Sequence, residues 1–238
     1  MNIRKYMIDI IKKDLDAALR KDPAATSKWQ VFFTYSGFKA ILRYRLAHWF
    51  YNKGFKGIAR YISMRARNRF AIDIHPAAQI GPGFFIDHGV GVVIGETTVI
   101  GEDCMLFQGV TLGGTGKDTG KRHPTLGNHV MVSAGATILG PVTVGDYCKI
   151  GAGSVVLINV PPHCTVVGIP GRIVRIKGEK PGELDHFLPD PILEEFKRLN
   201  KRISHLEDKL KIHTCKYSIA NQTEGMPIFT SEEEENKQ

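Results

Sequence analysis

Features that the sequence lacks exclude several classes of protein. No apolar run approaches the length that spans a bilayer, so we expect no membrane-crossing segment. Residues 1–20 mix lysine, arginine and aspartate, and they lack the apolar stretch and cleavage site of a signal peptide. No CxxC spacing occurs, and three of the four cysteines fall in a region that suits small buried side chains: Cys104, Cys148 and Cys164, with Cys215 beyond it. We therefore expect free thiols in a reducing, cytoplasmic setting.

The charge of the chain also lacks the pattern of a nucleic-acid-binding protein. The formal net charge is +8 at pH 7, but the positive residues lie mainly in two segments that flank the centre of the chain. The central region has no basic face interleaved with aromatic residues. A small polyanionic substrate accounts for the excess charge equally well. We expect neither nucleic acid nor membrane as a partner.

What the chain has instead is an aliphatic residue at every sixth position through its centre. The positions are Ile74, Ile80 and Ile86, then Ile94, Ile100, Leu106 and Leu112, then Leu126, Val132, Ile138, Val144, Ile150 and Val156. Glycine often follows the aliphatic residue. A period of six fits neither the 3.6-residue helix nor simple strand alternation. It is typical of a solenoid in which three short sides close a triangular coil, with aliphatic residues stacked inside and small residues at corners where φ is positive.

The repeat is interrupted twice, and each interruption brings a histidine beside a charged residue. Eight residues instead of six separate the aliphatic positions around residues 87–91, so a bulge is expected there. A longer insertion covers residues 113–124. A solenoid is a rigid scaffold, and residues that leave it are free for chemistry. We therefore expect the functional site at these two interruptions.

Segments on both sides of the repeat are predicted to be helical. Residues 1–72 form a helical N-terminal domain, in which apolar stripes indicate one helix before Asp22-Pro23 and two more over residues 38–52 and 58–70. The repeat domain, residues 73–177, ends in capping turns rich in proline, glycine and basic residues.

The C-terminal extension, residues 178–238, contains a heptad seam over about 190–212. Its apolar residues are spaced 4, 3, 4, 3 and 4 apart: Ile192, Phe196, Leu199, Ile203, Leu206 and Leu210. A self-associating coiled coil and a helix that lies on its own subunit both fit so short a seam. The polar, acidic tail from Ser218 onward is predicted to be disordered.

Several motifs in the repeat and after it carry a family resemblance. They are Asp73-Ile74-His75-Pro76, Ile86-Asp87-His88-Gly89, residues 91–97, residues 110–117, Arg122-His123-Pro124 and Gly168-Ile169-Pro170-Gly171-Arg172. Together with the spacing of the interruptions, they resemble the serine O-acetyltransferases, a family of hexapeptide-repeat acyltransferases, over roughly residues 20–177. The resemblance implies a mainly β fold: a left-handed parallel β-helix, preceded by a short α-helical segment and followed by a C-terminal helix. It also implies acetyl-CoA as co-substrate, L-serine as acceptor and a role in cysteine biosynthesis.

The resemblance assigns the chemistry to a histidine and a carboxylate. Acetylation of serine requires removal of the hydroxyl proton during attack on the thioester, and an imidazole suits that step. His88 corresponds to the family's base, and Asp73 to the carboxylate that holds its ring. The two are 15 residues apart, which we expect to place them at nearly superposed positions of successive coils, roughly 4.8 Å apart in height. The alternative for His88 is a structural histidine at a bulge.

The resemblance also assigns the contacts to the amino acid. Asp22 and Asp87 hold the ammonium of serine, and Arg122 with His123 holds its carboxylate, so that a zwitterion meets one pair of each kind. Asp22 fits equally well as a helix cap before Pro23.

The resemblance places acetyl-CoA in a cleft on the outside of the coil, between neighbouring subunits. Small residues admit the pantetheine arm, and amides in the turns bind its carbonyls or the oxyanion. The implied contacts are Gly114, Ala134, Lys149, Gly171 and Arg172. The basic residues around Arg172 suit the nucleotide phosphates and equally suit a solvated cap. No cysteine falls at the site, so we expect direct transfer within a ternary complex, with no metal.

The chain differs from the family in ways that affect its assembly. The helical segment is short compared with the helical domains by which some family members pair two trimers. We therefore expect a homotrimer, or a different assembly through the heptad seam at 192–210, and a dimer of trimers stays an alternative. The chain ends in Asn236-Lys237-Gln238 and not in the isoleucine that family members insert into a sulfhydrylase, which disfavours that docking. Feedback inhibition by cysteine, common in the family, is expected.

Other functions fit the same scaffold. The closest rival is an O-acetyltransferase for a sugar or another small hydroxyl compound. A zinc carbonic anhydrase of the hexapeptide type would draw on His75, His88 and His123, but the spacing of these histidines differs from that in such enzymes. A non-catalytic spacer would give no role to Asp73 or His88.

Overall fold

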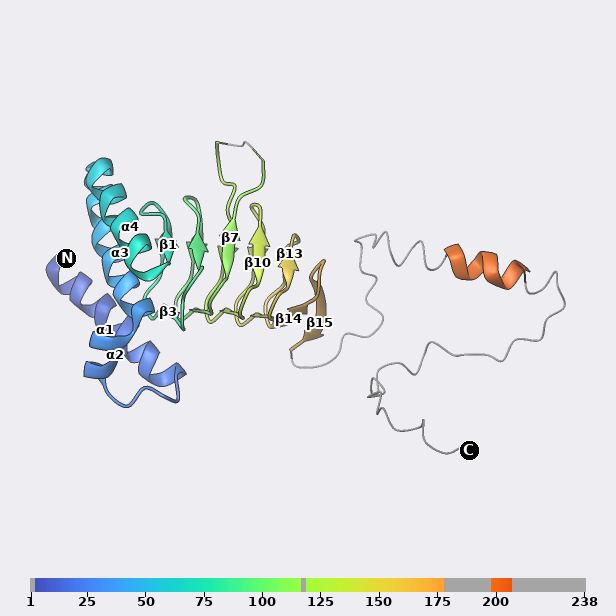
Figure 1. The fold of residues 1–238 in the computed structure, drawn as a ribbon, viewed down its shortest axis with the longest axis horizontal. Coiled ribbons are helices and arrows are strands. Elements are labelled where there is room, and N and C mark those ends of the chain that lie inside the picture. The colour runs from blue at the N-terminus through green and yellow to red at the C-terminus, as the bar shows by residue number, and fades with distance from the viewer. Residues whose placement is uncertain (1–2, 117–118, 178–197, 207–238) are drawn as a thin grey trace, which may run out of the picture. The chain divides into compact units, whose positions relative to one another are not determined.

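The structure of the chain is a computed structural model that describes residues 3–116, 119–177 and 198–206 (Figure 1). Contacts divide the chain into two units, Met1–Leu184 and Asp185–Gln238. The first unit holds both the helices and the repeat, and the domain boundaries at residues 72 and 177 stay a prediction. Within the described ranges, no helix combines the length and the apolarity needed to cross a bilayer.

Four helices begin the first unit: α1 (Ile3–Lys21), α2 (Lys28–Thr34), α3 (Ser36–Asn52) and α4 (Lys56–Phe70). Three of them match predicted helices, and α1 ends before Pro23 as expected. The sequence analysis missed α2. The signal for it was present, because Ser27 and Gln30 have the spacing of a capping box, and the Ser27 hydroxyl accepts from the Gln30 amide at 3.2 Å.

In the described residues, fifteen short strands form three sheets that enclose a common core. Sheet A contains, in hydrogen-bonded order, β1 (Asp73–Ile74), β4 (Val93–Ile94), β7 (Thr111–Gly113), β10 (Thr137–Leu139) and β13 (Val155–Val156). Sheet B contains β11 (Thr143–Val144), β8 (Thr125–Leu126), β5 (Val99–Ile100) and β2 (Gln79–Ile80). Sheet C contains β15 (Arg172–Ile176), β14 (Cys164–Val167), β12 (Lys149–Ile150), β9 (Met131–Val132), β6 (Met105–Leu106) and β3 (Phe85–Ile86).

The order of the strands confirms the predicted fold class. From β1 to β13, every third strand enters the same sheet, so one coil has three sides. Strand pairs are parallel, and the described exception is β14 with β15. This is the predicted left-handed parallel β-helix, a triangular prism that Figure 1 shows as a row of coils after the helices.

The aliphatic residues of the six-residue repeat form the core of the prism. Every predicted inward position from Ile74 to Val156 is buried, and none is more than 8% exposed. The registers stack them in columns, of which one in sheet A runs Ile74, Ile94, Leu112, Ile138 and Val156. Burial of one such side chain contributes about 1.5–3 kcal/mol. The thiols of Cys104, Cys148 and Cys164 are also buried and free, as predicted, while Cys215 lies outside the described residues.

The glycines that follow the aliphatic residues serve a different purpose from the predicted one. We expected them at corners with positive φ, but φ is positive at other residues, including Asp103 and His129 at 57° each. A Cβ at Gly101 would lie 2.6 Å from the carbonyl carbon of Gly127 in the next coil. The prediction of positive φ was therefore wrong for these glycines, which are required because successive coils approach closely.

The helical segment covers the outer face of sheet C in the first coils. Phe85 of β3 is buried in a second apolar cluster with α-helical residues that include Ala17, Val31 and Phe38. At the end of α4, Ala71 adopts a left-handed conformation with φ of 55° and turns the chain into β1. This packing places the end of α1 against the turn between β5 of sheet B and β6 of sheet C, where Arg20 and Lys21 contact Asp103.

The second unit has one described element, a helix over residues 198–206. Three residues of the predicted heptad seam lie in it, and each is exposed: Leu199, Ile203 and Leu206. The rest of the seam and the acidic tail lie outside the described residues, so the coiled coil stays a prediction.

Candidate active site

Tyr35 contacts one of the two carboxylates that are predicted to bind the serine ammonium, Asp22, and lies within electrostatic range of the other, Asp87. Its hydroxyl donates to Asp22 Oδ2 at 2.5 Å. Burial, the hydrogen bond to Asp22 and the nearby charge of Asp87 together raise the pKa of Tyr35 to about 12. The phenol therefore stays protonated, and it marks the place where a residue after α1 meets a residue of the bulge. The sequence analysis did not single out Tyr35.

Asp22 is not the cap of the next helix. The N-cap of α2 is Ser27. Asp22 Oδ1 instead accepts from the amide of Ala24 at 2.8 Å, while Oδ2 accepts from Tyr35. The cap alternative is therefore wrong, and the ammonium role stays a prediction.

His88 lies on the predicted bulge, with its side chain outside the prism. The residue is exposed and has a φ of 57°. The Ser36 hydroxyl, at the start of α3, donates to the His88 carbonyl at 3.2 Å. Gly37 lies against the same strand end, where a Cβ would come within 2.1 Å of the Ile86 carbonyl oxygen. The main chain of the bulge is thus held from the helical side and by neighbouring coils, where the Gly109 amide donates to the Val90 carbonyl at 2.9 Å, while the imidazole faces solvent.

The register corrects one detail of the predicted pair of Asp73 and His88. Asp73 lies level with Val93, five residues beyond His88. A regular coil of three six-residue sides would already pair Asp73 with residue 91, and the bulge moves the partner two residues further. The bulge does pack beside Asp73, since a Cβ at Gly89 would lie 2.6 Å from the Cδ1 atom of Ile72. Asp73 Oδ2 lies 3.5 Å from Arg67 Nη1. Its orienting role toward His88 stays a prediction.

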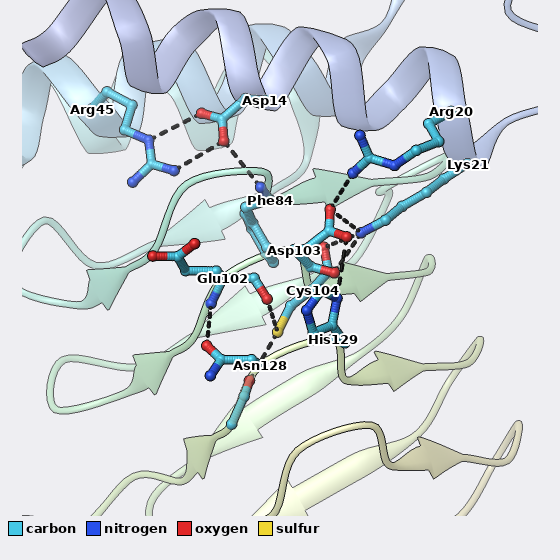
Figure 2. A network of polar contacts seen from close by, with 11 residues as sticks. Asp14, Arg20, Lys21, Arg45, Phe84, Glu102, Asp103, Cys104, Asn128 and His129 are labelled. Carbon is cyan, nitrogen blue, oxygen red and sulfur yellow. Dashed lines mark hydrogen bonds and ion pairs between the residues drawn. The ribbon is translucent and has the colours of Figure 1, made fainter. Parts of the chain in front are cut away.

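Figure 2 shows the polar contacts that fix the end of α1 on the prism. Arg20 Nη2 lies 2.5 Å from Asp103 Oδ1, and Lys21 Nζ lies 3.1 Å from the same oxygen and donates to the Asp103 carbonyl at 2.5 Å. His129 Nδ1 approaches the other carboxylate oxygen at 3.2 Å. Burial raises the pKa of Asp103, but the neighbouring basic side chains, Lys21 first, lower it below its ordinary value. Because Asp22 follows Lys21 in the chain, these contacts also fix the predicted ammonium ligand.

A second ion pair in Figure 2 joins Asp14, which lies earlier in α1, to Arg45 of α3. Both side chains are buried, and their atoms pair at 3.1 Å twice. The Phe84 amide also donates to Asp14 at 2.9 Å. Burial raises the pKa of Asp14, although Arg45 opposes this. Removal of one partner of such a buried pair typically costs about 3–5 kcal/mol, so the pair ties α1 and α3 firmly to the prism.

The other predicted pair, Arg122 and His123, rests on the turn formed by residues 95–98 in the preceding coil. Arg122 Nη2 lies 2.6 Å from Glu96 Oε2. His123 is only 8% exposed, and its Nδ1 lies 2.9 Å from the Thr97 hydroxyl. Burial first, and then the charge of Arg122, lowers the pKa of His123. The Lys121 ammonium donates to the Thr97 carbonyl at 2.6 Å and so fastens the exit of the insertion.

Sheet A separates the two halves of the predicted site. Asp87 and His88 lie where sheet C leads into sheet A, and Asp22 is joined to this side through Tyr35, whereas Arg122 and His123 lie where sheet A leads into sheet B. A six-residue side at about 3.3 Å per residue is about 20 Å long, much longer than one serine molecule. A single chain therefore does not bring all the predicted serine contacts together.

The predicted acetyl-CoA contacts also fall into two groups, one on or beside sheet C and one in the insertion. Ala134 follows β9 at a corner between sheets C and A, and the Gly171 amide donates to the Val155 carbonyl of sheet A at 2.7 Å. Lys149 and Arg172 begin strands of sheet C. Gly114 lies apart from these four, in the insertion, where a Cβ would be 3.2 Å from the side chain of Arg122.

The histidines of the rival zinc hypothesis do not converge within one chain. His75 Nδ1 accepts from the Ala77 amide at 3.1 Å, and burial lowers the pKa of His75. His123 lies close enough to His75 to influence it, but His88 lies at the other corner. In the part of the chain that the structure describes, no three His, Cys, Asp or Glu side chains form a group that would hold a metal ion.

Comparisons with known proteins decide the family. Residues 123–157 match the family model described as bacterial transferase hexapeptide (six repeats). The serine acetyltransferase of Bacillus pumilus is 52% identical over 203 residues, which cover 84% of this chain and 94% of that protein. The chain belongs to the serine acetyltransferase family. This confirms the predicted resemblance.

Solved structures of the serine acetyltransferase family agree with this assignment. One is the serine acetyltransferase of Neisseria gonorrhoeae in complex with serine, with a TM-score of 0.70 and 42% identity over 72% of this chain and 70% of that chain. Another is the enzyme of Brucella abortus in complex with coenzyme A, with a TM-score of 0.69 and 44% identity over 73% of this chain and 68% of that chain.

Proposed function

We propose that this chain transfers the acetyl group of acetyl-CoA to the hydroxyl of L-serine. The observation that carries the proposal is the hydrogen bond of Tyr35 to Asp22, with Asp87 close enough to act on the same phenol and the exposed His88 next to Asp87 in the chain. Two carboxylates beside an imidazole suit a substrate with an ammonium group and a hydroxyl whose proton must be removed. Membership of the serine acetyltransferase family supports the same substrates.

In the proposed mechanism, His88 takes the proton from the serine hydroxyl as the oxygen attacks the thioester carbonyl. The carbon–sulfur bond then breaks, acetyl stays on the serine oxygen, and the leaving thiolate takes the proton from the imidazolium. Asp73 stabilises the imidazolium. Burial raises the pKa of all three described cysteines, that of Cys104 to about 11, so their thiols are poor nucleophiles. Direct transfer without an acetyl-enzyme follows.

The separation of the two halves supports a site shared between neighbouring copies of the chain. The corner with His88 would face the corner with Arg122 and His123 of the next copy, and a closed ring of three copies gives each chain both contacts. The homotrimer, or a dimer of trimers, is therefore part of the proposal.

Acetyl-CoA would lie along the corner between sheets C and A, in the coils that follow the bulge. Four glycines succeed one another at this corner, each with positive φ: Gly91, Gly109, Gly135 and Gly153. A Cβ at Gly91 would lie 3.5 Å from Gly109, and a Cβ at Gly109 would lie 3.3 Å from Gly135. Without side chains, this column lets the pantetheine arm approach the main chain beside Ala134.

A thiol-release assay tests the acceptor. Purified protein is given acetyl-CoA with L-serine, L-homoserine or a hexose, and free CoA is followed. We expect L-serine to have the highest kcat/KM, with inhibition by cysteine in competition with serine. A higher kcat/KM for the sugar would instead assign the scaffold to the rival O-acetyltransferase.

A subunit-mixing experiment tests the shared site. His88→Ala and Arg122→Ala chains are each weak with serine, but co-assembled chains contain some sites with both native residues. We expect activity to rise well above that of either variant alone. Co-assembled chains that stay inactive would place both residues in the site of one chain.

A further inference from the structure

The contacts of Thr97 fix where the proton of His123 lies. The Thr97 backbone amide donates to His123 Nδ1 at 3.2 Å. A backbone amide has a donor but no acceptor at nitrogen, so Nδ1 must accept and carries no hydrogen. A neutral imidazole with Nδ1 as acceptor has its proton on Nε2.

The hydroxyl of Thr97 reinforces the same state. Its oxygen accepts from the backbone amides of Arg122 and His123, at 3.1 Å each. These two bonds use both lone pairs of the hydroxyl, which leaves only its hydrogen to place. His123 Nδ1 lies 2.9 Å away and can accept it. Thr97 thus presents two donors to one ring nitrogen.

The surroundings of the ring also disfavour a second proton. The imidazole packs closely against Gly95, where a Cβ would come within 1.9 Å of Cδ2 and 2.1 Å of Nε2. The charged or titratable side chains that act on it are Arg122, Lys121, Glu96 and His75. Of the three charged side chains, only Glu96 favours the imidazolium, and its carboxylate is paired with Arg122.

We propose that Thr97 is a positioning residue, which holds His123 neutral with its proton on Nε2 so that the imidazole donates this N–H to an oxygen of the bound substrate. In this arrangement Arg122 provides the positive charge that attracts the serine carboxylate, and the neutral His123 donates a hydrogen bond that orients the substrate. The substrate half of the inference rests on the proposed function, whereas the state of the ring does not.

The first experiment reads the ring directly in the full chain without substrate. Histidine labelled with ¹⁵N is incorporated, and the two ring nitrogens are distinguished by NMR, with His123→Asn used to assign the signals. We expect Nδ1 to be unprotonated and Nε2 protonated at pH 7.5. A proton on Nδ1, or an imidazolium, would overturn the proposal whatever the enzyme's substrate is.

The second experiment tests the role of the Thr97 hydroxyl with three variants. Thr97→Val removes it, Thr97→Ser keeps it, and Thr98→Val is the matched control. Thr98 is fully buried, and in the described part of the chain its hydroxyl has no hydrogen-bond partner. Removal of that hydroxyl is therefore expected to leave folding and kinetics unchanged.

For Thr97→Val we expect the KM for serine to rise about fivefold, the effect of one lost neutral hydrogen bond while the Thr97 backbone amide still donates to Nδ1, and kcat and the KM for acetyl-CoA should stay within about twofold. The NMR titration of His123 should move to higher pH, and Thr97→Ser should restore both values.

Equal KM for serine in Thr97→Val and Thr97→Ser would overturn the positioning role. If Thr97→Val does not fold, the protonation state of His123 in the native protein and the NMR titration of His123 in Thr97→Ser still test the proposal. An enzyme with the expected ring state but no turnover of serine would count against the proposed function alone.

Discussion

The two interruptions of the prism are held in different ways. The bulge at residues 87–91 is short, and its main chain is held by Ser36 and Gly37 on the helical side and by hydrogen bonds to the neighbouring coils. The insertion at residues 113–124 is long, and side chains of its exit are fastened to the turn at residues 95–98. A short excursion can thus be positioned through its backbone, which leaves its side chains available. In a long excursion, the side chains predicted to contact substrate are held in place by other side chains.

The largest expected effect comes from replacing His88, whose side chain is exposed on the bulge. His88→Ala should lower kcat by about 10²–10⁴, because general base catalysis contributes that much. Binding of acetyl-CoA, measured by calorimetry, should be unchanged, since the bulge is held through its main chain. A variant with near-native kcat would remove His88 from the base role.

The next prediction concerns the backbone support of the bulge. Gly37→Ala should destabilise the protein by about 1–3 kcal/mol, because the new methyl group would overlap the Ile86 carbonyl and push α3 away. Gly57→Ala is the control, since a Cβ at Gly57 has no neighbour within 4 Å among the described residues and alanine favours a helix. Urea unfolding measures both. An equal response of the two variants would mean that the close approach of α3 is not needed.

Arg122→Ala tests the insertion, where side chains have the positioning task. We expect the KM for serine to rise roughly 10- to 100-fold, the range for a lost charged hydrogen bond of about 1.5–3 kcal/mol, with less effect on the KM for acetyl-CoA. Glu96→Gln should reproduce part of the effect, because Glu96 orients the guanidinium. A larger change for acetyl-CoA than for serine would move Arg122 to the other substrate.

The smallest effect is the dependence of stability on pH. Burial is the main cause that lowers the pKa of both His75 and His123. Below about pH 6.5 the unfolded histidines bind protons that the folded ones resist, so the free energy of unfolding should fall as the pH falls through that range. Thermal unfolding between pH 8 and 5.5 measures this, and His123→Asn should reduce the slope. A slope that does not change in the variant would contradict the burial argument.

Several parts of the candidate site followed from the sequence because they are local. The bulge and the insertion are visible as breaks in a fixed period, and the histidines stand next to charged residues in both. Tyr35, Asp103 and Thr97 were missed because each acts through a partner in another element, as in the contact from Asp103 to Arg20, 83 residues away in sequence. Asp73 was placed at the wrong level because its 15-residue separation from His88 falls short of a full three-sided coil, which the bulge lengthens further.

By itself, the sequence determined the three-sided coil, its buried columns and the two places where the chain leaves it, because a period of six repeats the same local packing at each step. Only the tertiary structure decided which residues face one another across that scaffold. Helices far back in the sequence dock on sheet C and bring Asp22 toward Asp87, and a full side of the prism keeps these carboxylates apart from Arg122. Such distances depend on how elements pack, which no repeat within a single segment encodes.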